Sequence, residues 1–219
     1  MAYRVRLFVD FWNFQLQWNE HLSSEQQCDW PRLPARFVAQ AQTAITDAGI
    51  EGALQLEETR VYASYNPARA EDTRLQGWLS NFLDRQASFR VFSTERKDKP
   101  ARVHCRACDR DFDACPSCSA PLVRSREKGV DTAIVTDLLS LAWEGAFDVA
   151  VLVSSDADMI PCVHRVQEKG FKVINATWPI RGQALAQACW ASFGIMPVAP
   201  GLVRPGRTTG QAAAAATPH

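Results

Sequence analysis

The sequence predicts an α/β fold in which helices cover both faces of a mostly parallel β-sheet. Short apolar runs rich in β-branched and aromatic residues alternate with longer segments of helical periodicity. The run DVAVLVSSD at residues 148–156 is continuously apolar until its polar end, as in a strand buried on both faces. With 219 residues, of which 47% are hydrophobic, the chain is long enough for one domain and a small appended module.

The first half of the chain contains three predicted strands and two predicted helices. Residues 4–10, RVRLFVD, form the first strand, and the Trp-rich polar stretch after it is assigned no element. Apolar residues at helical spacing predict a helix from Pro31 to Asp47, which Gly49 ends. The next elements are a strand within 54–65, a helix at about 69–85 and a strand at 89–93.

The second half continues this alternation after an interruption. A charged segment from about Arg96 to Arg126 precedes a helix at about 129–145. The later elements are the strand at 148–156, a helix that Gly170 ends, a strand at 171–177 and a helix near 182–190. The predicted organisation is a main domain over residues 1–195, an inserted zinc-binding hairpin at 100–124 and a disordered tail, rich in Pro, Gly and Ala, at 197–219.

Acidic residues fall at positions that this fold brings together. Asp10 and Asp156 end two strands, and parallel sheets bind ligands at the carboxyl ends of their strands. Asp158 follows in the turn, and Asp131 begins the preceding helix. Taken singly, each can instead be a turn residue or a helix N-cap. Asp137 is turned away from Asp131 around the helix axis and is expected to be exposed or structural.

These four acids, Asp10, Asp131, Asp156 and Asp158, are called the acid cluster below. Converging carboxylates repel one another unless a cation lies between them, and oxygen ligands suit hard divalent cations such as Mg²⁺ or Mn²⁺. Such ions drive phosphodiester hydrolysis by activating water and by stabilising charge on the attacking and leaving oxygens. The acid cluster therefore predicts a metal-dependent nuclease.

Three segments resemble the NYN domain family, a branch of the PIN-like nuclease superfamily, and within it the LabA-like proteins. They are LFVDFWNF, EKGVDTAIVTDLLSLA and VAVLVSSDADMIPCVHRVQEKGFKV, in order within residues 4–177. The resemblance implies a three-layer, Rossmann-like PIN fold and Mg²⁺- or Mn²⁺-dependent cleavage of RNA. It implies that Asp10, Asp156 and Asp158 are metal ligands. It also implies Asp131 as a further acid and Asn13 as a group that positions the first acid or the substrate.

The last of these segments departs from the family pattern. Where the family commonly has Ser-Gly-Asp-Ser-Asp-Phe, this chain has Ser-Ser-Asp-Ala-Asp-Met, with Ser154 expected to shape the turn. Ser155 in place of Gly indicates a less cramped backbone, and Ala157 removes a hydroxyl that can touch metal or phosphate. Both differences favour an alternative in which the fold holds nucleic acid or a protein without cleaving it.

The insertion contains four cysteines in the pattern CxxC-x₆-CxxC, namely Cys105, Cys108, Cys115 and Cys118. Two such knuckles present four thiolates to one Zn²⁺, and a complete set of four leaves no open position, so we predict a structural zinc site. The neighbouring His104 is expected to be a bystander. The alternative is four unligated thiols. Cys28, Cys162 and Cys189 are scattered in apolar surroundings, which argues against a disulfide framework.

Basic residues concentrate around the insertion, although the formal net charge of the chain is zero. They are Arg96, Lys97, Lys99, Arg102, Arg106, Arg110, Arg124, Arg126 and Lys128. Because phosphate contacts supply much of nucleic-acid affinity, a basic hairpin beside the acids can clamp RNA. The candidate substrate contacts are Arg124, Arg126, Lys128 and Ser154. The alternative is a solvated insertion, since several acids dilute its charge.

Aromatic residues offer a second way to hold a nucleic acid. Trp12, Trp18 and Tyr65 lie near predicted strand ends and can stack on unpaired bases, although core packing is the commoner role. The other tryptophans on predicted helix faces, Trp78, Trp143 and Trp190, are predicted to be core residues.

No segment approaches the roughly 20 apolar residues of a membrane span, and the N-terminus lacks a signal-peptide pattern, so we expect a cytoplasmic protein without a membrane partner. The leading function is an endoribonuclease that acts on RNA, with DNA as a second possible substrate. The alternative is a non-catalytic module that binds nucleic acid or protein. An aspartyl phosphotransferase of dehalogenase type usually needs an acid two residues after the first, where Trp12 stands here. The resemblance leaves a homodimer open.

Overall fold

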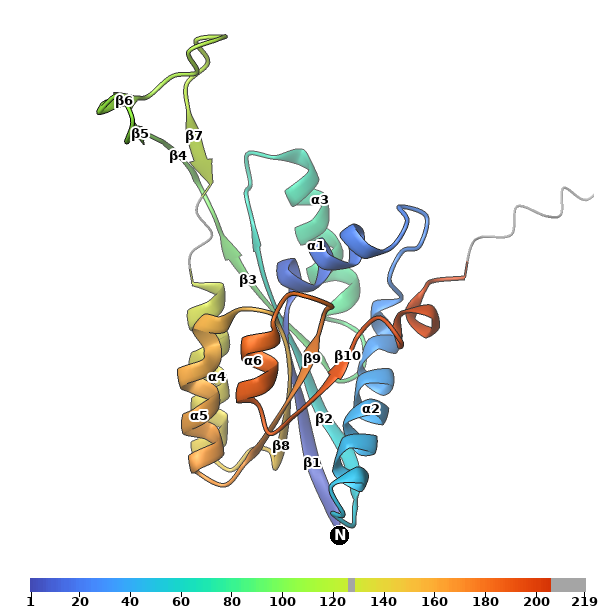
Figure 1. Ribbon diagram of the computed structural model, residues 1–219. Coiled ribbons are helices and arrows are strands. Elements are labelled where there is room, and N and C mark those ends of the chain that lie inside the picture. Colours follow the sequence, from blue (N-terminus) through green and yellow to red (C-terminus); the bar gives the residue numbers. More distant parts are fainter. Residues whose placement is uncertain (126–128, 206–219) are drawn as a thin grey trace, which may run out of the picture.

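The computed structural model describes residues 1–125 and 129–205, and its centre is a six-stranded sheet in which every neighbouring pair is parallel. The strand order is β10-β9-β8-β1-β2-β3. The strands are β1 (Ala2–Asp10), β2 (Ala53–Tyr65), β3 (Phe89–Glu95), β8 (Val149–Val153), β9 (Lys172–Thr177) and β10 (Ala191–Gly194). The predicted α/β fold with a mostly parallel sheet is therefore confirmed (Figure 1).

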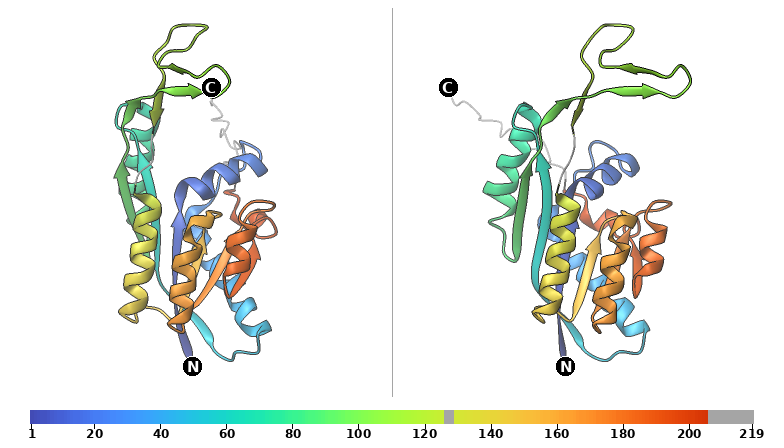
Figure 2. Two further views of the ribbon diagram at one scale, coloured as in Figure 1. Left: turned by 60° about the vertical axis from the view of Figure 1, so that its left-hand side comes forward. Right: turned by 90° about the vertical axis from the view of Figure 1, so that its left-hand side faces the viewer.

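Helices cover both faces of this sheet, which gives three layers (Figure 2). One face is covered by α1 (Phe11–His21), α2 (Leu33–Asp47) and α3 (Ala70–Trp78), which continues into a π-helical turn at Leu79–Leu83. The other face is covered by α4 (Val130–Trp143), α5 (Ile160–Glu168) and α6 (Gln183–Ala188). Successive side chains of β1 serve the two cores alternately, since Leu7 and Val9 pack on the first face and Phe8 on the second.

Helix α1 occupies the stretch to which the sequence assigned no element. Its residues include several Trp, Phe and Asn, which are middling or weak helix formers. Phe11, Phe14 and Trp18 share one helical face, and all three are buried in the core. Tertiary burial of this aromatic face, together with an N-cap at Asp10, therefore stabilises a helix that local propensity does not favour.

The C-terminal part of the described chain is more ordered than the sequence indicated. Residues Ala191–Gly194 form β10 against β9, whereas no strand was predicted there. Ala199 and Leu202 are buried, and Val203 forms a β-bridge with Cys28. The prediction that a disordered tail begins at residue 197 is therefore wrong for 197–205, because apolar residues within that Pro- and Gly-rich stretch pack on the domain. Residues 206–219 lie outside the described residues.

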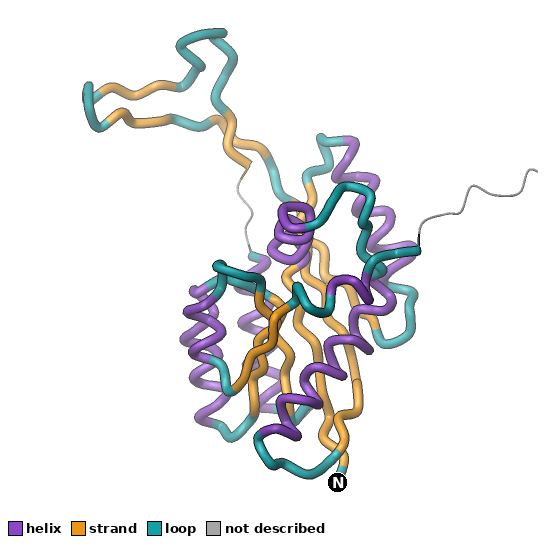
Figure 3. Tube along the Cα trace, turned by 45° about the vertical axis from the view of Figure 1, so that its right-hand side comes forward, coloured by secondary structure: helices purple, strands orange, loops and turns teal. Residues whose placement is uncertain are grey.

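The insertion leaves the sheet after β3 and projects beyond its carboxyl edge (Figure 3). Its stem pairs β4 (Asp98–Pro100) with β7 (Val123–Ser125), and its outer part pairs β5 (Val103–Cys105) with β6 (Arg110–Phe112). Both pairs are antiparallel. Across residues 1–125 and 129–205, no helix combines the length and apolarity that a membrane crossing needs.

Candidate active site

The strand order locates a crevice at the carboxyl edge of the sheet. From β1 the chain proceeds outward through β2 to β3, whereas from β8 it proceeds in the opposite direction through β9 to β10. The helix after β1 lies on one face and the helix after β8 on the other. Doubly wound sheets bind their ligands where the direction of winding reverses in this way. The end of β1 next to the end of β8 is therefore the expected binding position.

Asp10 lies at this position and is almost completely enclosed. Its side chain caps α1, with Oδ1 accepting a hydrogen bond of 3.1 Å from the backbone N–H of Asn13. The hydroxyl of Ser154, which follows β8, lies 3.5 Å from the other carboxylate oxygen. Asp10 is only 6% exposed, so this carboxylate is held in a fixed orientation at the sheet edge.

Hydrogen bonds with α1 and β9 hold the turn after β8 and the end of β8, and one further bond lies within the turn. Asn13 accepts a 3.0 Å bond from the Ser155 N–H, and the Ser154 hydroxyl accepts a 3.2 Å bond from the Asp156 N–H. From β9, the amide of Asn175 donates to the backbone oxygens of Leu152 and Ser154. Asn13 and Ser154 therefore position the turn that carries Asp156.

Asn175 is a residue of this site that sequence reasoning missed. It is fully buried in β9, and its two donated bonds fix the end of β8. The signal was present in the sequence, because Asn175 stands among the apolar residues of VINA in a predicted strand, and a buried carboxamide is costly unless it is hydrogen-bonded.

The other three acids, Asp131, Asp156 and Asp158, are more exposed than Asp10. Asp156 is half-buried and caps the 3₁₀ turn Ala157–Met159 by accepting a 2.9 Å bond from the Asp158 N–H. Asp158 is exposed, and Asp131 is exposed in the first turn of α4. Within the described residues, no three Asp, Glu, His or Cys side chains lie close enough to share one metal ion. The structure therefore connects Asp10 with the Asp156 turn through Ser154, and it does not draw the four acids into a closed ligand set.

Ser154 shapes the turn as expected, whereas the surroundings of Ser155 differ from the expectation. Ser154 is 2% exposed, and its hydroxyl contacts the Asp10 carboxylate and the Asp156 N–H. Ser155 packs against Gly182, where a Cβ atom would lie 2.9 Å from both Cα and Cβ of Ser155. The backbone around Ser155 is therefore crowded, contrary to the expectation, and Gly182 with its φ of +79° makes the room that Ser155 needs.

Asp137 has a structural position, as the sequence indicated. Its Oδ2 accepts bonds from Arg60 at 2.6 Å and from the Tyr62 hydroxyl at 2.7 Å, both on β2. Burial and this carboxylate together raise the pKa of Tyr62. Asp137 thus ties α4 to β2.

The two cysteine knuckles have the same backbone shape. The Cys105 carbonyl accepts from the Asp109 N–H and the Cys115 carbonyl from the Ser119 N–H, both at 2.8 Å, and Asp109 and Ser119 both have positive φ. Backbone N–H groups of Cys108 and Ala107 lower the pKa of Cys105, and those of Cys118 and Ser117 lower that of Cys115.

The cysteines outside the knuckles are buried, and the adjacent His104 has an acidic partner. Cys28, Cys162 and Cys189 are buried, and none of the seven cysteines is in a disulfide. The ring of His104 lies 3.0 Å from Asp111, which gives it a partner outside the knuckles. The knuckle cysteines themselves are partly or fully exposed and do not converge on one point.

Basic side chains line a cavity of about 450 Å³ at the base of the insertion. They are Arg96, Lys97, Lys99, Arg102 and Arg124, and Glu95 is the one acid among them. Arg96 is fixed by a 2.7 Å ion pair with Asp72. Of the predicted substrate contacts, Arg124 therefore lies in a basic cavity, and Arg126 and Lys128 lie outside the described residues.

The tryptophans are distributed differently from the prediction. Trp18 is a core residue at 1% exposure, but Trp143 is 52% exposed on α4 and Trp190 is 36% exposed. Trp78 is half-buried and, with Trp12, lines a cavity beside α1. The prediction that all the helix-face tryptophans are core residues is therefore wrong for Trp143 on α4 and for Trp190, which follows the end of α6, since both rings are exposed.

Comparisons with known proteins agree with this architecture. The sequence model of the NYN domain matches residues 4–193. Among solved structures, the chain is similar to VPA0982, a protein of unknown function from Vibrio parahaemolyticus RIMD 2210633, with a TM-score of 0.52 and 18% identity over 88% of this chain and 93% of that one. That likeness concerns the fold. No curated protein shows a significant match. Because the family match spans most of the chain, including both strand ends of the crevice, the protein belongs to the NYN domain family of the PIN-like nuclease superfamily.

Proposed function

We propose that this protein is a metal-dependent endoribonuclease whose Mg²⁺ or Mn²⁺ is held at the carboxyl edge of the sheet. The observation that carries the proposal is the enclosed carboxylate of Asp10 at the point where the winding of the sheet reverses. Its enclosure and its hydrogen bond from the Asn13 N–H keep the Asp10 carboxylate in one orientation, as a metal ligand requires. Its connection through Ser154 to the Asp156 turn brings hard oxygen donors from two neighbouring strands to one edge.

Each residue of the edge has a distinct role in this proposal. Asp10 and Asp156 are the principal metal ligands, Asp158 and Asp131 supply further carboxylates, and water completes the coordination of an ion such as Mg²⁺. When bound, the ion supplies an activated water and stabilises charge on the phosphate oxygens. Asn13 and Ser154 hold the ligand-bearing segments in place, in the way that groups behind a metal site orient its ligands.

The substrate class follows from the charge around the edge. The cavity lined by Arg96, Lys97, Lys99, Arg102 and Arg124 lies at the base of the insertion, which leaves the sheet from the same end as the acids. Positive side chains at that place can bind the phosphates of a strand whose scissile bond lies near Asp10. RNA is the proposed substrate, and DNA is the comparison that the assay includes.

We also propose a structural Zn²⁺ bound by Cys105, Cys108, Cys115 and Cys118. Two features support it: the matching backbone shape of the two knuckles, and N–H groups that stabilise the thiolate form of the first cysteine in each. Four thiolates complete a tetrahedral shell, so this ion stabilises the insertion and takes no part in hydrolysis.

The alternative is a module that binds nucleic acid without cleaving it. Two observations favour it: Ala157 and Ser155 stand where the family commonly has Ser and Gly, and the acid cluster is not closed around one point. In that case the basic cavity still binds RNA, and the acids act only as helix caps.

A cleavage assay separates the two functions. Labelled RNA and DNA of mixed sequence are incubated with Mn²⁺, Mg²⁺ or EDTA and with the wild type, Asp10→Asn, or an Asp156→Asn/Asp158→Asn double variant. Asp47→Asn is the matched control, since Asp47 is exposed at the end of α2. The proposal expects internal cleavage of RNA by the wild type and Asp47→Asn, only with metal. If the folded wild type binds RNA but cleaves it under none of these conditions, the result would support the binding module instead.

A further inference from the structure

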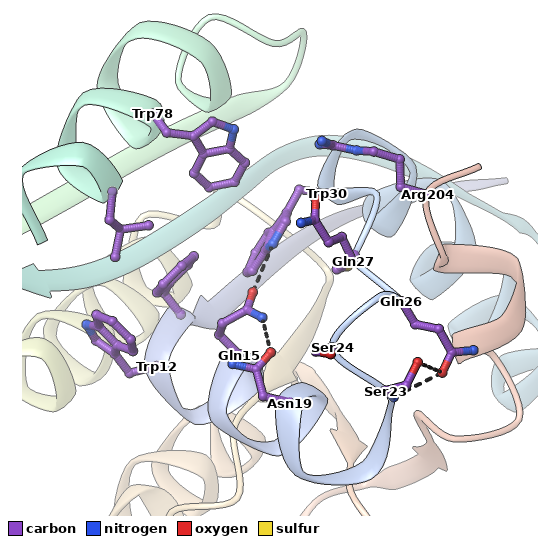
Figure 4. Close-up of a pocket in the computed structure, with 13 residues that line it drawn as sticks. Trp12, Gln15, Asn19, Ser23, Ser24, Gln26, Gln27, Trp30, Trp78 and Arg204 are labelled. Atoms are coloured by element: carbon purple, nitrogen blue, oxygen red, sulfur yellow. Dashed lines mark hydrogen bonds between the residues drawn. The ribbon is translucent and has the colours of Figure 1, made fainter. Parts of the chain in front are cut away.

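The carboxyl edge of the sheet, with Asp10 and the turn that carries Asp156, is called the acid edge below. A cavity of about 670 Å³ lies beside it, between α1, α3 and the loop 22–30 (Figure 4). Its walls carry three tryptophans: Trp12 on α1, Trp30 at the start of the 3₁₀ turn Trp30–Arg32, and Trp78 at the end of α3. None of these side chains has a role in the acid edge itself. The cavity is therefore a separate feature whose ligand has to be inferred from its own chemistry.

The aromatic residues form a continuous wall. Phe11 stacks on Trp30 with ring centroids 5.1 Å apart, and Trp30 meets Trp78 edge to face at 6.2 Å. Trp30 is 3% exposed and belongs to the floor, whereas Trp12 and Trp78 are half-buried and keep indole surface toward solvent. Such a wall suits a flat aromatic ligand.

Amide groups occupy the side of the cavity formed by α1. Gln15 donates to Asn19 at 2.8 Å and accepts from the Trp30 indole N–H at 3.4 Å, as Figure 4 shows. Carboxamides donate and accept hydrogen bonds, which matches the edge of a nucleobase better than it matches an aliphatic or lipid ligand.

Positive charge flanks the cavity on two sides. Arg204 lines its outer wall, and the guanidinium of Arg96 lies 5.1 Å from the centre of the Trp12 ring. Arg96 also lines the basic cavity at the base of the insertion. Trp12 therefore lies between the aromatic cavity and the basic cavity, so that one nucleic-acid strand can contact both.

Helix α1 connects this cavity to the acid edge. Its first residues Phe11 and Trp12 line the cavity, its cap residue is Asp10, and Asn13 faces the turn after β8. A bound strand has to cross only the first turn of α1 to pass from one to the other.

We propose that this cavity binds an unpaired nucleobase of a single-stranded RNA whose backbone passes over Trp12 to the acid edge. The proposal rests on the nuclease function for its substrate class. Bases in a duplex are stacked and paired, so they do not enter such a cavity. Unstacked bases bind to aromatic faces and to polar side chains, and both line this cavity. The protein therefore selects single strands.

The test measures binding without cleavage. Fluorescein-labelled RNA of short mixed sequence, and its duplex, are titrated in EDTA with the full-length wild type, Trp78→Ala and Trp78→Phe. The matched control is Trp143→Ala, because Trp143 is exposed on α4, which covers the opposite face of the sheet from α1. Circular dichroism confirms that each variant is folded.

Loss of one stacked base weakens binding by about 5- to 150-fold, which is the range measured for removal of a stacking aromatic residue. We expect that loss for single-stranded RNA in Trp78→Ala, with binding largely retained in Trp78→Phe and unchanged in Trp143→Ala. We expect no effect of Trp78→Ala on the weaker binding of the duplex.

Equal affinity of folded Trp78→Ala and wild type for single-stranded RNA would overturn the proposal. If Trp78→Ala does not fold, a Trp78→Phe variant that binds duplex and single strand equally well overturns it too. Failure of the nuclease function looks different, since RNA then stays intact with Mn²⁺ while the Trp78→Ala defect in EDTA persists.

Discussion

Replacement of Asp137 tests whether the structure separates structural acids from functional ones. Asp137→Ala removes the single oxygen, Oδ2, that accepts from both Arg60 and Tyr62. The family motif gives no reason to treat this aspartate differently from Asp131, which lies on the same helix. The structure does, because it places Asp137 against β2.

The magnitude follows from the two lost bonds. A hydrogen bond between charged groups contributes about 1.5–3 kcal/mol, and a buried hydroxyl left without its partner costs about 1–3 kcal/mol. The lower parts of both ranges apply, because the Asp137 side chain is 28% exposed and Arg60 keeps its ion pair with Glu58. Alanine recovers roughly 0.5 kcal/mol of helix propensity. With about 1.5 kcal/mol for the ion pair and about 1 kcal/mol for the hydroxyl, the net loss is about 2 kcal/mol.

For a domain of this size, that loss lowers the midpoint of thermal unfolding by about 4–8 °C. The assay is thermal unfolding followed by circular dichroism, together with RNA cleavage well below the midpoint. Asp137→Asn is the matched control: it keeps a carbonyl acceptor, and its cost is about 1 kcal/mol or less. We expect Asp137→Ala to be destabilised and active, and Asp156→Asn to be stable and inactive.

Two results would refute this reasoning. An unfolding midpoint of Asp137→Ala equal to that of the wild type would mean that the contacts with Arg60 and Tyr62 contribute nothing to stability. Loss of RNA cleavage by folded Asp137→Ala, with normal stability, would place this acid among the metal ligands.

Three further predictions concern stability and the insertion. Gly182→Ala should lower the free energy of unfolding in urea by about 2 kcal/mol, through its positive φ and its contact with the turn after β8; an unchanged value would contradict the crowding found there. Cys105→Ser should abolish zinc binding, as measured by elemental analysis of the purified protein, and leave the main unfolding transition in place. Zinc retained by this variant would exclude the four-cysteine site. Burial alone would raise the pKa of Asp72, but hydrogen bonds from Arg96 and the Asn66 N–H lower it. Its stabilising contribution should thus be present above about pH 4 and be lost as the pH falls below that value, and Asp72→Asn should flatten this part of the stability profile measured by urea unfolding.

The sheet and the position of Asp10 could be predicted from sequence because buried parallel strands have a strong and simple pattern. Continuous apolar runs such as 148–156 mark strands buried on both faces, and an acid directly after such a run has to lie at the carboxyl edge. The relation between Asp10 and Asp156 follows from topology alone. Local sequence therefore marked the strand ends, and the fold class that the alternation of strands and helices predicts brought them together.

The remaining features depend on contacts between distant segments. Helix α1 is stabilised by the burial of Phe14 and Trp18, which no local propensity reveals. The crowding at Ser155 depends on Gly182, a residue in a later loop. The aromatic cavity combines α1, α3 and the loop between α1 and α2, so its tryptophans appeared in the sequence only as separate apolar residues.

Titration of the full-length protein with Mn²⁺, followed by the electron paramagnetic resonance signal of the free ion, tests whether the acid edge is a metal site. We expect the wild type and Asp47→Asn to bind the ion with the same affinity, and Asp10→Asn to bind it at least about 10-fold more weakly. The cysteine knuckles do not compete, because thiolates prefer softer ions such as Zn²⁺. Equal Mn²⁺ affinity of folded Asp10→Asn and wild type would contradict the proposed metal-dependent nuclease centre.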